Sequence, residues 1–506
     1  MKRRKIMFSI LFVLAIVAAG IVMTMPRALS IRPRIWFPEP VDVFATDQAS
    51  MSDSAVGTIK LLTVTENEDG PGLQARPVDP ATLASFPGAA PINFGQHYTY
   101  AVGPDRKTLA VIIWPSGSDN AGGALHLIDL ETWTDTPADL RLDNYVGNLT
   151  FGAAGKTLYW TIPAAHDLTQ GMPLDYQLYR YDLDSRQLST VVRLPSSFMP
   201  WGQQPILPTG KLAIFGVPTD SENLAEDAPH VLIVDLARDR ITADMRLDGV
   251  KAGQFRENLT NATPPARGES WQYVTYNPGL AWDLENSLLY IVHADEDKVT
   301  VVDLAREAIA QQTRLHPQRS FLEWLSASLT LTAQAKGGPE LQVRAVLSRD
   351  GKRLYVFSQD TETGQLKAAK LRVIATDGMR EVSHIDDLLT DFALTPDDKS
   401  LLVVKGETVN LYGFDMMVSR DVYVLDAETL QEHAHVRADR TDNLWFDGFS
   451  PDGRYAYMNG ASAQWVEGSG WRDWRTPWQL LDLNSYRLTS SSDSTGSYAA
   501  LLHIIP

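Results

Sequence analysis

The sequence predicts an all-β protein: a seven-bladed β-propeller of four-stranded antiparallel blades, preceded by an N-terminal transmembrane helix. Two observations lead to this fold class. A basic cluster and a 20-residue apolar run open the chain, and a tight turn followed by an apolar strand recurs seven times beyond residue 96. Repeats of several tens of residues are typical of solenoids and propellers.

The composition fits a large folded protein and excludes several function classes. Of the 506 residues, 44% are hydrophobic and 21% are charged, which is too apolar for a disordered chain. The 62 acidic and 45 basic residues give a net charge of -17, so the average field repels phosphate backbones and no nucleic-acid partner is expected. The chain has no cysteine, which removes disulfides, thiolate metal sites, thiol nucleophiles and covalent haem attachment.

Residues 1–25 are predicted to be a membrane anchor or a signal. The basic residues 2–5 precede an apolar run from Ile6 to Met25, which is long enough for a helix to cross a hydrocarbon core about 30 Å thick. Signal-peptide cores are usually roughly 7–15 residues, so an uncleaved anchor is favoured, although Ala28 and Ser30 would suit cleavage. The basic cluster keeps the N-terminus in the cytoplasm. We therefore expect a bacterial cell-membrane protein with one span and an extracytoplasmic propeller, secreted if the segment is cleaved.

Seven copies of one pattern carry the fold prediction. Each copy opens with a tight turn and a polar residue and continues as an apolar strand. The turns and strands read Pro104-Asp105 into Leu109-Ala110-Val111, Gly155-Lys156 into Leu158-Tyr159-Trp160, Gly210-Lys211 into Leu212-Ala213-Ile214, Asn286-Ser287 into Leu289-Tyr290-Ile291, Gly351-Lys352 into Leu354-Tyr355-Val356, Asp398-Lys399 into Leu401-Leu402-Val403, and Gly453-Arg454 into Tyr455-Ala456-Tyr457.

A further strand in each copy ends in an acid, whose carboxylate can accept backbone N–H groups two residues on and so start a turn. The fifth copy departs from this, with Ala375 in place of the acid. A last strand, such as Ile241 to Leu247, completes four short antiparallel strands. The other strand ends are Leu127-Ile128-Asp129, Tyr181-Asp182, Val234-Asp235, Val302-Asp303, Leu425-Asp426 and Leu481-Asp482.

Units of this kind leave apolar sheet faces uncovered, and stacking them radially as a propeller buries those faces. The segments Thr58 to Glu66, Leu73 to Val78 and Tyr498 to Ile505 also read as strands. They either close a ring of seven by strand exchange, which we favour, or form an eighth blade split between the termini. The expected organisation is an anchor or signal at 1–25, a linker at 26–55, and a propeller at 56–506 with clear repeats over 97–490.

The repeats resemble those of the YVTN-type β-propeller family of bacterial extracytoplasmic proteins. The stretches Phe449 to Tyr457 (FSPDGRYAY) and Leu347 to Val356 (LSRDGKRLYV) are similar to that family's SPDGKRLYV phrase. Asp421 to Thr429 (DVYVLDAET) is similar to its VSVIDTAT strand. The third and fourth copies match weakly, and the Gly-His and Trp-Asp signals of WD40 repeats are missing from their expected places.

The connections between strands predict which face of the ring binds. First-to-second and third-to-fourth turns share one face and stay short, whereas the connections on the other face are long and varied. Long loops on a rigid scaffold are where binding usually resides. An apolar spacing within Ser320 to Ala335 predicts a short helix that caps the central channel. The varied connections are Trp114 to Gly123, Pro163 to Gln177, Val217 to His230, Glu407 to Arg420, Gly460 to Pro477, and the inter-blade segments Val250 to Gln272 and His316 to Gln342.

Motifs for catalysis or cofactors are missing from the sequence. No G-x-S-x-G elbow, P-loop, dinucleotide fingerprint or H-E-x-x-H motif occurs, so no catalytic residue and no cofactor is assigned. His433 and His435 stand two apart on one strand but lack a third ligand, so no metal site is assigned either. The acidic turn from His293 to Asp297 offers oxygen ligands for calcium, but a solvated turn is the favoured reading.

One group of residues is predicted to bind a ligand: Trp465, Trp471, Arg472, Trp474 and Arg475, in the long connection of the last copy. Trp and Arg are favoured at binding hot spots, and aromatic rings also stack on sugars. The competing interpretation is that these residues pack the loop, with Trp478 in the blade core.

These observations favour a binding or scaffold protein that contacts a protein, peptide or glycan through its long-loop face, and they favour binding over catalysis. The alternative is a propeller enzyme. The fold resembles that of lactonase-like hydrolases and of quinoprotein-dehydrogenase-like subunits, but one fold hosts many functions.

Overall fold

The computed structural model divides the chain into two compact units, Met1–Val41 and Asp42–Pro506, and every residue that it describes belongs to the second. The described residues are 61–66, 72–95, 97–114, 122–142, 146–163, 175–195, 198–218, 228–256, 273–315, 340–362, 365–411, 414–438, 443–466, 470–475, 478–490 and 499–503.

In these ranges no helix has the length and apolar character needed to span a bilayer. The predicted anchor from Ile6 to Met25, the linker to residue 55 and the predicted helix within 320–335 all lie outside the described residues. They stay predictions.

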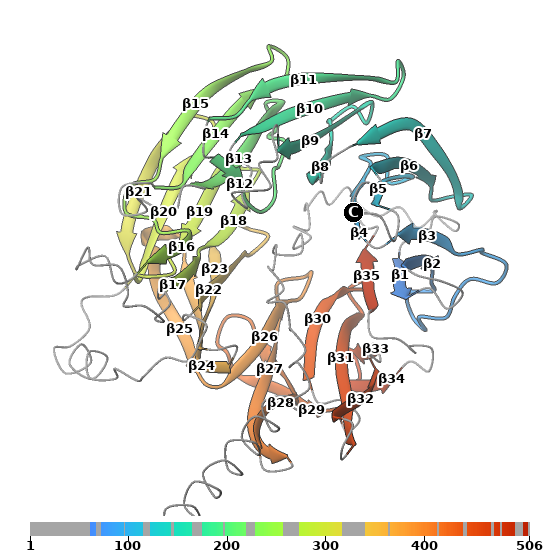
Figure 1. The fold of residues 1–506 in the computed structure, drawn as a ribbon. Helices are drawn as coiled ribbons and strands as arrows, with labels where there is room; N and C mark the ends of the chain where they lie inside the picture. The colour runs from blue at the N-terminus through green and yellow to red at the C-terminus, as the bar shows by residue number, and fades with distance from the viewer. Residues whose placement is uncertain are drawn as a thin grey trace, which may run out of the picture. The chain divides into compact units, whose positions relative to one another are not determined.

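The described residues form a β-propeller, with strands throughout and a single 3-10 turn, η1 (Asp377–Met379). Each of the seven predicted repeats forms four strands that pair antiparallel in chain order, and we call each set a blade (Figure 1). The blades are, in order, β4 (His97–Val102), β5 (Thr108–Trp114), β6 (Gly123–Asp129) and β7 (Thr134–Leu142); β8 (Gly147–Phe151), β9 (Thr157–Pro163), β10 (Tyr176–Asp182) and β11 (Gln187–Arg193); β12 (Phe198–Pro200), β13 (Lys211–Pro218), β14 (His230–Asp235) and β15 (Arg240–Arg246); β18 (Gly279–Asp283), β19 (Leu288–Val292), β20 (Lys298–Asp303) and β21 (Ala308–Arg314); β22 (Glu340–Leu347), β23 (Arg353–Glu362), β24 (Gln365–Ala375) and β25 (Arg380–Asp386); β26 (Leu389–Leu394), β27 (Ser400–Leu411), β28 (Phe414–Asp426) and β29 (Glu432–Arg437); β30 (Asn443–Phe449), β31 (Tyr455–Val466), β33 (Trp478–Asp482) and β34 (Arg487–Ser490).

The first and the last of the described strands meet in one further sheet, which we call the terminal sheet. The strand β35 (Ala499–His503) pairs antiparallel with β1 (Leu61–Glu66), β1 with β2 (Leu73–Pro77), and β2 with β3 (Ile92–Gly95). In Figure 1 the red β35 lies beside the blue β1. The predicted terminal strands therefore pair with one another, and β3, which the sequence did not indicate, completes a set of four.

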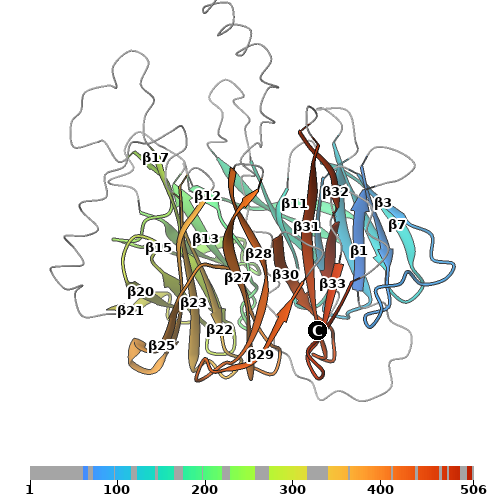
Figure 2. The same ribbon diagram turned by 90° about the horizontal axis from the view of Figure 1, so that it is seen from below.

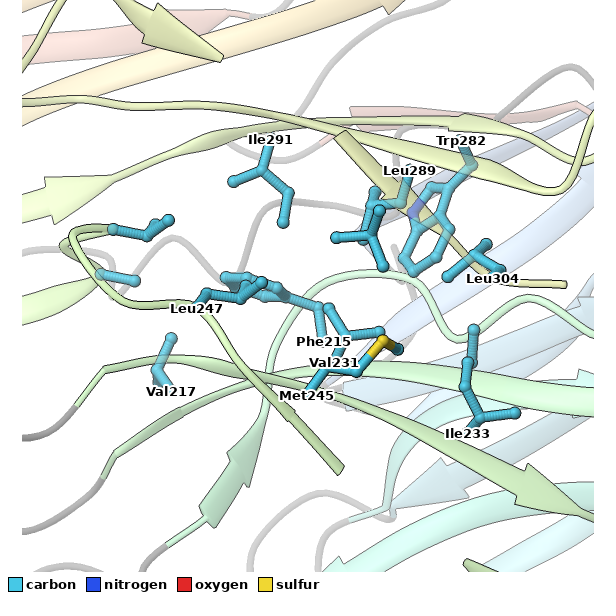
Figure 3. Packing of buried hydrophobic residues seen from close by; sticks show 14 of the residues in the cluster. Phe215, Val217, Val231, Ile233, Met245, Leu247, Trp282, Leu289, Ile291 and Leu304 are labelled. Atoms are coloured by element: carbon cyan, nitrogen blue, oxygen red, sulfur yellow. The ribbon is translucent and has the colours of Figure 1, made fainter. Parts of the chain in front are cut away.

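An apolar core fills the space between each sheet and the next. Between the third and fourth blades, Phe215 and Val231 face Trp282, Leu289 and Ile291 (Figure 3). The same kind of core lies between the first and second, second and third, fourth and fifth, fifth and sixth, and sixth and seventh blades. Two more cores join the terminal sheet to the first blade and to the seventh blade.

The second strand of each blade is buried on both faces. In β5, Leu109 and Val111 face the terminal sheet, whereas Ala110 and Ile112 face the second blade. A strand covered on both sides needs apolar residues at every position, which explains runs such as Leu-Ala-Val-Ile-Ile-Trp. Full burial of one such aliphatic side chain contributes about 1.5–3 kcal/mol.

The turns repeat with the same geometry in every blade. At least one residue of each first-to-second turn and of each third-to-fourth turn has positive φ, which closes the turn tightly. In the first-to-second turns these are Arg106, Gly155, Gly210, Ser287, Gly351, Asp398 and Gly453, and in the third-to-fourth turns Trp133, Arg186, Asp239, Glu307, Met379, Leu430 and Tyr486.

The strand-end acids cap these turns as predicted. Asp426 accepts hydrogen bonds from the backbone N–H groups of Glu428 (3.0 Å) and Thr429 (2.7 Å), and these bonds lower the pKa of its carboxyl. Asp79 of the terminal sheet likewise accepts hydrogen bonds from the backbone N–H groups of Ala81 and Thr82. This further capped turn was not predicted from the sequence, although Val78-Asp79-Pro80-Ala81-Thr82 has the spacing of Leu425-Asp426-Ala427-Glu428-Thr429.

Replacing Leu62 of β1 by Ala tests whether the terminal sheet is part of the folded core. Leu62 is fully buried against the first blade, so we expect the free energy of unfolding to fall by about 2–5 kcal/mol. Chemical denaturation would measure the loss. Leu188→Ala, at a position that is 41% exposed, is the control and should change stability by less than about 0.5 kcal/mol. Equal stability of Leu62→Ala and wild type would contradict the closure.

Candidate functional site

The two ends of the blades differ in construction. The capped turns described above gather at one end, which we call the constant face. The second-to-third connections and the connections between blades gather at the other end, the variable face (Figure 2). A ligand site that distinguishes this protein from any other propeller is therefore expected on the variable face.

On the variable face, the fifth, sixth and seventh blades carry longer strands than the first four. The strands β27 and β28 continue as a ladder as far as the pair Leu411 and Phe414. In the seventh blade β31 continues past the blade and pairs with an added strand, β32 (Gly470–Arg475). The sequence analysis placed loops at Glu407 to Arg420 and at Gly460 to Pro477, and in both places the structure has paired strands (Figure 2).

The hairpin of β27 and β28 bends at Gly406 and crosses to the next blade. The register shifts between Lys405 and Gly406, and the Gly406 N–H donates to the Leu388 carbonyl at 2.7 Å. A Cβ at Gly406 would lie 3.0 Å from a Thr390 methyl group, so glycine suits this close approach. Beyond the bend, Ser419 pairs in parallel with Asn443 of β30.

The connection from the third to the fourth blade also contains strands. The short β16 (Gly253–Arg256) pairs antiparallel with β17 (Tyr273–Asn277), and β17 pairs in parallel with the inner strand β22 of the fifth blade. The predicted long loop from Val250 to Gln272 is thus partly a strand that extends the inner edge of a neighbouring blade.

Hydrogen bonds lock the inner strands of the last three blades to one another. Arg344 of β22 pairs with Asp391 of β26 at 2.5 Å, and its guanidinium lies 4.7 Å from the ring centroid of Phe392. Asp391 is buried and also accepts from the backbone N–H of Phe446 in β30 at 2.6 Å. A buried carboxylate with a charged partner and two further donors holds one geometry, so this section of the inner wall is rigid.

The acidic turn between β19 and β20 is a buried junction between blades. His293 is 2% exposed, and its Nε2 lies 2.9 Å from the Thr300 hydroxyl. Burial lowers the pKa of His293 to about 4, the charge of Lys298 acts in the same direction, and a hydrogen bond with the Gly249 backbone acts against it. The imidazole is therefore neutral at pH 7.

Two carboxylates of the same turn hold its neighbours. Burial raises the pKa of Asp295, and Lys251, whose Nζ lies 3.6 Å from a carboxylate oxygen, partly offsets this. Asp297 pairs at 2.7 Å with Arg372 of the fifth blade, whose side chain is only 4% exposed. The favoured expectation of a solvated turn was wrong for His293 and Asp295, because this five-residue connection lies under the inter-blade segment that contains Lys251.

Among the described ionisable groups of the variable face, His293 and Asp295 are the pair whose pKa values burial moves in opposite directions. Burial lowers the pKa of His293 and raises the pKa of Asp295, so it favours the neutral imidazole and the neutral carboxyl. Groups with shifted pKa values mark candidate functional sites. Here they contact the segment that contains Gly249 and Lys251, and Asp297 of the same turn pairs with Arg372 of the fifth blade, so we assign the turn a structural role.

The predicted ligand residues lie in the hairpin of β31 and β32. Trp465 is paired with Trp471, and Arg472 with Gln464. Trp474 lies where β32 bulges, next to Arg475, which is paired with Ser462. The side chains of this hairpin lie outside the described residues, so the predicted site stays a prediction. Trp478, by contrast, is 2% exposed in the core between the seventh blade and the terminal sheet, as the competing interpretation stated for it.

His433 and His435 engage separate carboxylates. His435 stacks on Tyr423 at 4.5 Å between ring centroids and lies 2.7 Å from Asp421. His433 lies 3.7 Å from Asp426. Among the residues that the structure describes, no three His, Asp or Glu side chains gather in a way that could hold a metal ion.

Comparison with known proteins yields likeness in fold alone. No family model and no curated protein matches the chain. Among solved structures, the dihydro-heme d1 dehydrogenase NirN in complex with DHE is similar with a TM-score of 0.48 and 12% identity, over 90% of this chain and 77% of that one. AztD from Citrobacter koseri has a TM-score of 0.45 and 10% identity, over 88% and 98%. An oligogalacturonate lyase in complex with manganese has a TM-score of 0.40 and 12% identity, over 80% and 94%. At these values the likeness carries no argument about function.

Replacing His293 by Gln tests the buried junction. The folded-state pKa of about 4 lies below the ordinary 6.5, so unfolding takes up a proton as the pH falls through this window. Stability is fully present above pH 6.5 and is lost towards pH 4, by about 2 kcal/mol between pH 7 and pH 5. We expect His293→Gln to remove this component of the pH dependence, measured by denaturation at both pH values. Asp295 titrates in the opposite sense but is present in both proteins.

The matched control is His433→Gln, at a side chain that is 47% exposed. It should keep the wild-type difference between pH 7 and pH 5. An unchanged difference in His293→Gln would mean that His293 is not buried as described.

Proposed function

We propose that the protein is an extracytoplasmic binding or scaffold propeller that uses its variable face to contact a protein, peptide or glycan. The observation that carries this proposal is the contrast between the two faces. One face repeats tight turns with a positive-φ residue in every blade, whereas the other face carries hairpins of three consecutive blades and a β16–β17 addition that no other blade shares among the described residues.

The scaffold beneath the variable face suits a binding role. The inner strands are joined by the contacts of Arg344, Asp391 and Phe446. The turn from His293 to Asp297 contacts Lys251 of the preceding connection and Arg372 of the fifth blade. Hairpins that rise from such a base lose less conformational freedom on binding than free loops would, which favours affinity.

We further propose that the ring has eight blades, with the terminal sheet as the eighth, in place of the favoured seven. The terminal sheet has four antiparallel strands, a core on each side and its own capped turn at Asp79.

The proposed likeness to YVTN-type repeats is supported by the turn geometry. Ser450 bonds to Asp452 at 2.6 Å and accepts from the Tyr455 N–H at 2.8 Å, which gives the Ser-Pro-Asp-Gly phrase a physical role.

The proposed location is a membrane surface, with residues 1–25 as anchor or signal. The described chain begins at Leu61 of β1, opposite His503, at the end of β1 that adjoins the Asp79 turn. The preceding chain therefore joins the ring at the constant face. This leaves the variable face, opposite to the point of attachment, open to a partner.

A photoreactive amino acid at one position of each face tests the proposal in cells. Thr408 is exposed on the β27 hairpin, and Arg186 is exposed in a constant-face turn. We expect covalent adducts of defined mass from position 408 and few from position 186, because partners contact the variable face. Gel shifts and mass spectrometry of the adducts would measure this. Adducts from position 186 alone would overturn the proposal.

A substitution of Trp474 tests the proposed ligand residues Trp465, Trp471, Arg472, Trp474 and Arg475. We expect Trp474→Ala to keep the melting temperature and to weaken binding of the captured partner by tenfold or more, about what removing a hot spot of 2 kcal/mol does. Trp478→Ala is the matched control, because Trp478 is in the core and its loss should lower the melting temperature. The opposite result for Trp474→Ala, a lower melting temperature with unchanged binding, would show that Trp474 packs the hairpin.

A further inference from the structure

The connection between β2 and β3 differs from the other third-to-fourth turns of the constant face. It runs from residue 78 to residue 91, whereas the turns of the seven blades have four or five residues. Its residues 84–91 read Ala-Ser-Phe-Pro-Gly-Ala-Ala-Pro and contain no charge. All of them are exposed except Ala89, which is half-buried, and Phe86 is 39% exposed. We call residues 84–91 together with Trp133 the apolar patch.

The patch is held in one conformation. Phe86 N–H donates to the Pro77 carbonyl at 3.1 Å, and Leu83, only 3% exposed, anchors the start of the loop in the core. The Trp133 indole of the first blade donates to the Ala90 carbonyl at 2.7 Å and ties the far end of the loop to the neighbouring turn. The loop therefore presents Phe86 to solvent with little conformational freedom to lose on contact.

The patch residues carry no charge themselves, and two of the charged groups beside Trp133 are paired. Lys107 and Glu131 pair with each other at 2.6 Å, and the Asp79 carboxylate accepts hydrogen bonds from the backbone of its own turn. In a protein with a net charge of -17, a neutral apolar area can approach a lipid headgroup region without the repulsion that acts on the rest of the surface. Aromatic side chains such as Phe and Trp partition into that region.

The patch also lies where the N-terminal segment of the chain joins the ring. β1 begins at Leu61 in the same sheet, at the end where β2 runs into the patch loop, and Val78 N–H donates to the Leu61 carbonyl at 3.0 Å. The 35 residues between Met25 and Leu61 can span up to roughly 120 Å when extended, so a tether of this length brings the patch within reach of the bilayer.

We propose that the apolar patch, Phe86 foremost, contacts the interfacial region of the lipid bilayer and so orients the ring with its constant face towards the membrane. This inference rests on the membrane attachment proposed above. Coverage of the patch by the chain's own linker is an outcome that the experiment separates.

The test uses the absence of native cysteine, which permits a single fluorescent label. The variant Pro87→Cys is labelled in the patch with an environment-sensitive dye, and Thr408→Cys is labelled on the variable face. The full chain is reconstituted into phosphatidylcholine vesicles. In a second arm, a polyhistidine tag replaces residues 1–25 and binds vesicles that contain nickel-chelating lipid; this keeps the whole compact unit from Asp42 onward.

We expect a blue-shifted emission at position 87 that doxyl-labelled lipids quench, and an unchanged emission at position 408. Phe86→Ser should lower the population in lipid contact by roughly tenfold. Ile309→Ser, at a position that is 40% exposed, should leave it unchanged; Ile309 is in β21, which Figure 1 labels on the opposite side from β2 and β3.

Several results would overturn the inference. Equal emission of the position-87 label with and without vesicles means that the patch does not touch lipid. A blue shift in the second-arm chain without vesicles means that the chain's own residues cover the patch. Equal quenching at positions 87 and 408 means that the contact has no orientation. Failure of the full chain to float with vesicles, with lipid contact in the tagged arm, would instead refute the proposed anchor and support the patch inference.

Discussion

The fold depends on burial of both faces of its sheets. A second strand such as β5, apolar at every position, needs a covering sheet on each side, and each covering sheet has a further apolar face of its own. An open row of such sheets would expose an apolar face to water at each end. A ring avoids this exposure because the last sheet covers the first. The terminal sheet takes that place between the seventh blade and the first. Its strands β1 and β35 are more than four hundred residues apart in sequence, so the ring closes only after residues 499–503 have been made.

The two faces of the closed ring differ in how much the length of their connections can vary. At the constant face most turns are short, and the capping acids and positive-φ residues repeat because the same geometry recurs, whereas the connection from residue 78 to residue 91 is longer. At the variable face a connection can lengthen without disturbing the cores, and three consecutive blades extend their ladders there. The Arg344–Asp391 pair and the buried His293 show that polar groups near this face are used to hold neighbouring blades together.

The repeats were predictable because each copy contains its own local signals, a turn residue, a capping acid and an apolar run, which need no knowledge of distant partners. The strands of the hairpin at Glu407 to Arg420 were not, because Gly406 and Gly413 read as loop punctuation, and the pairing that overrides them is a property of two strands together. His293 was misjudged for a related reason: its turn looks acidic and solvated in sequence, and its burial comes from a segment about forty residues away along the chain. The Trp and Arg residues of the last blade lie on the β31–β32 hairpin, and the exposure of their side chains stays a prediction.

The closure also determines how the ring would respond to mechanical load. β1 lies between β35 and β2, with five residue pairs on each side. A pull applied at Leu61 along the strand would load the hydrogen bonds of both ladders together, in shear. A pull from the side of the strand would instead break the bonds in succession, each bearing the load alone. Pairing β1 on both sides would thus give the ring a shear-loaded attachment at Leu61.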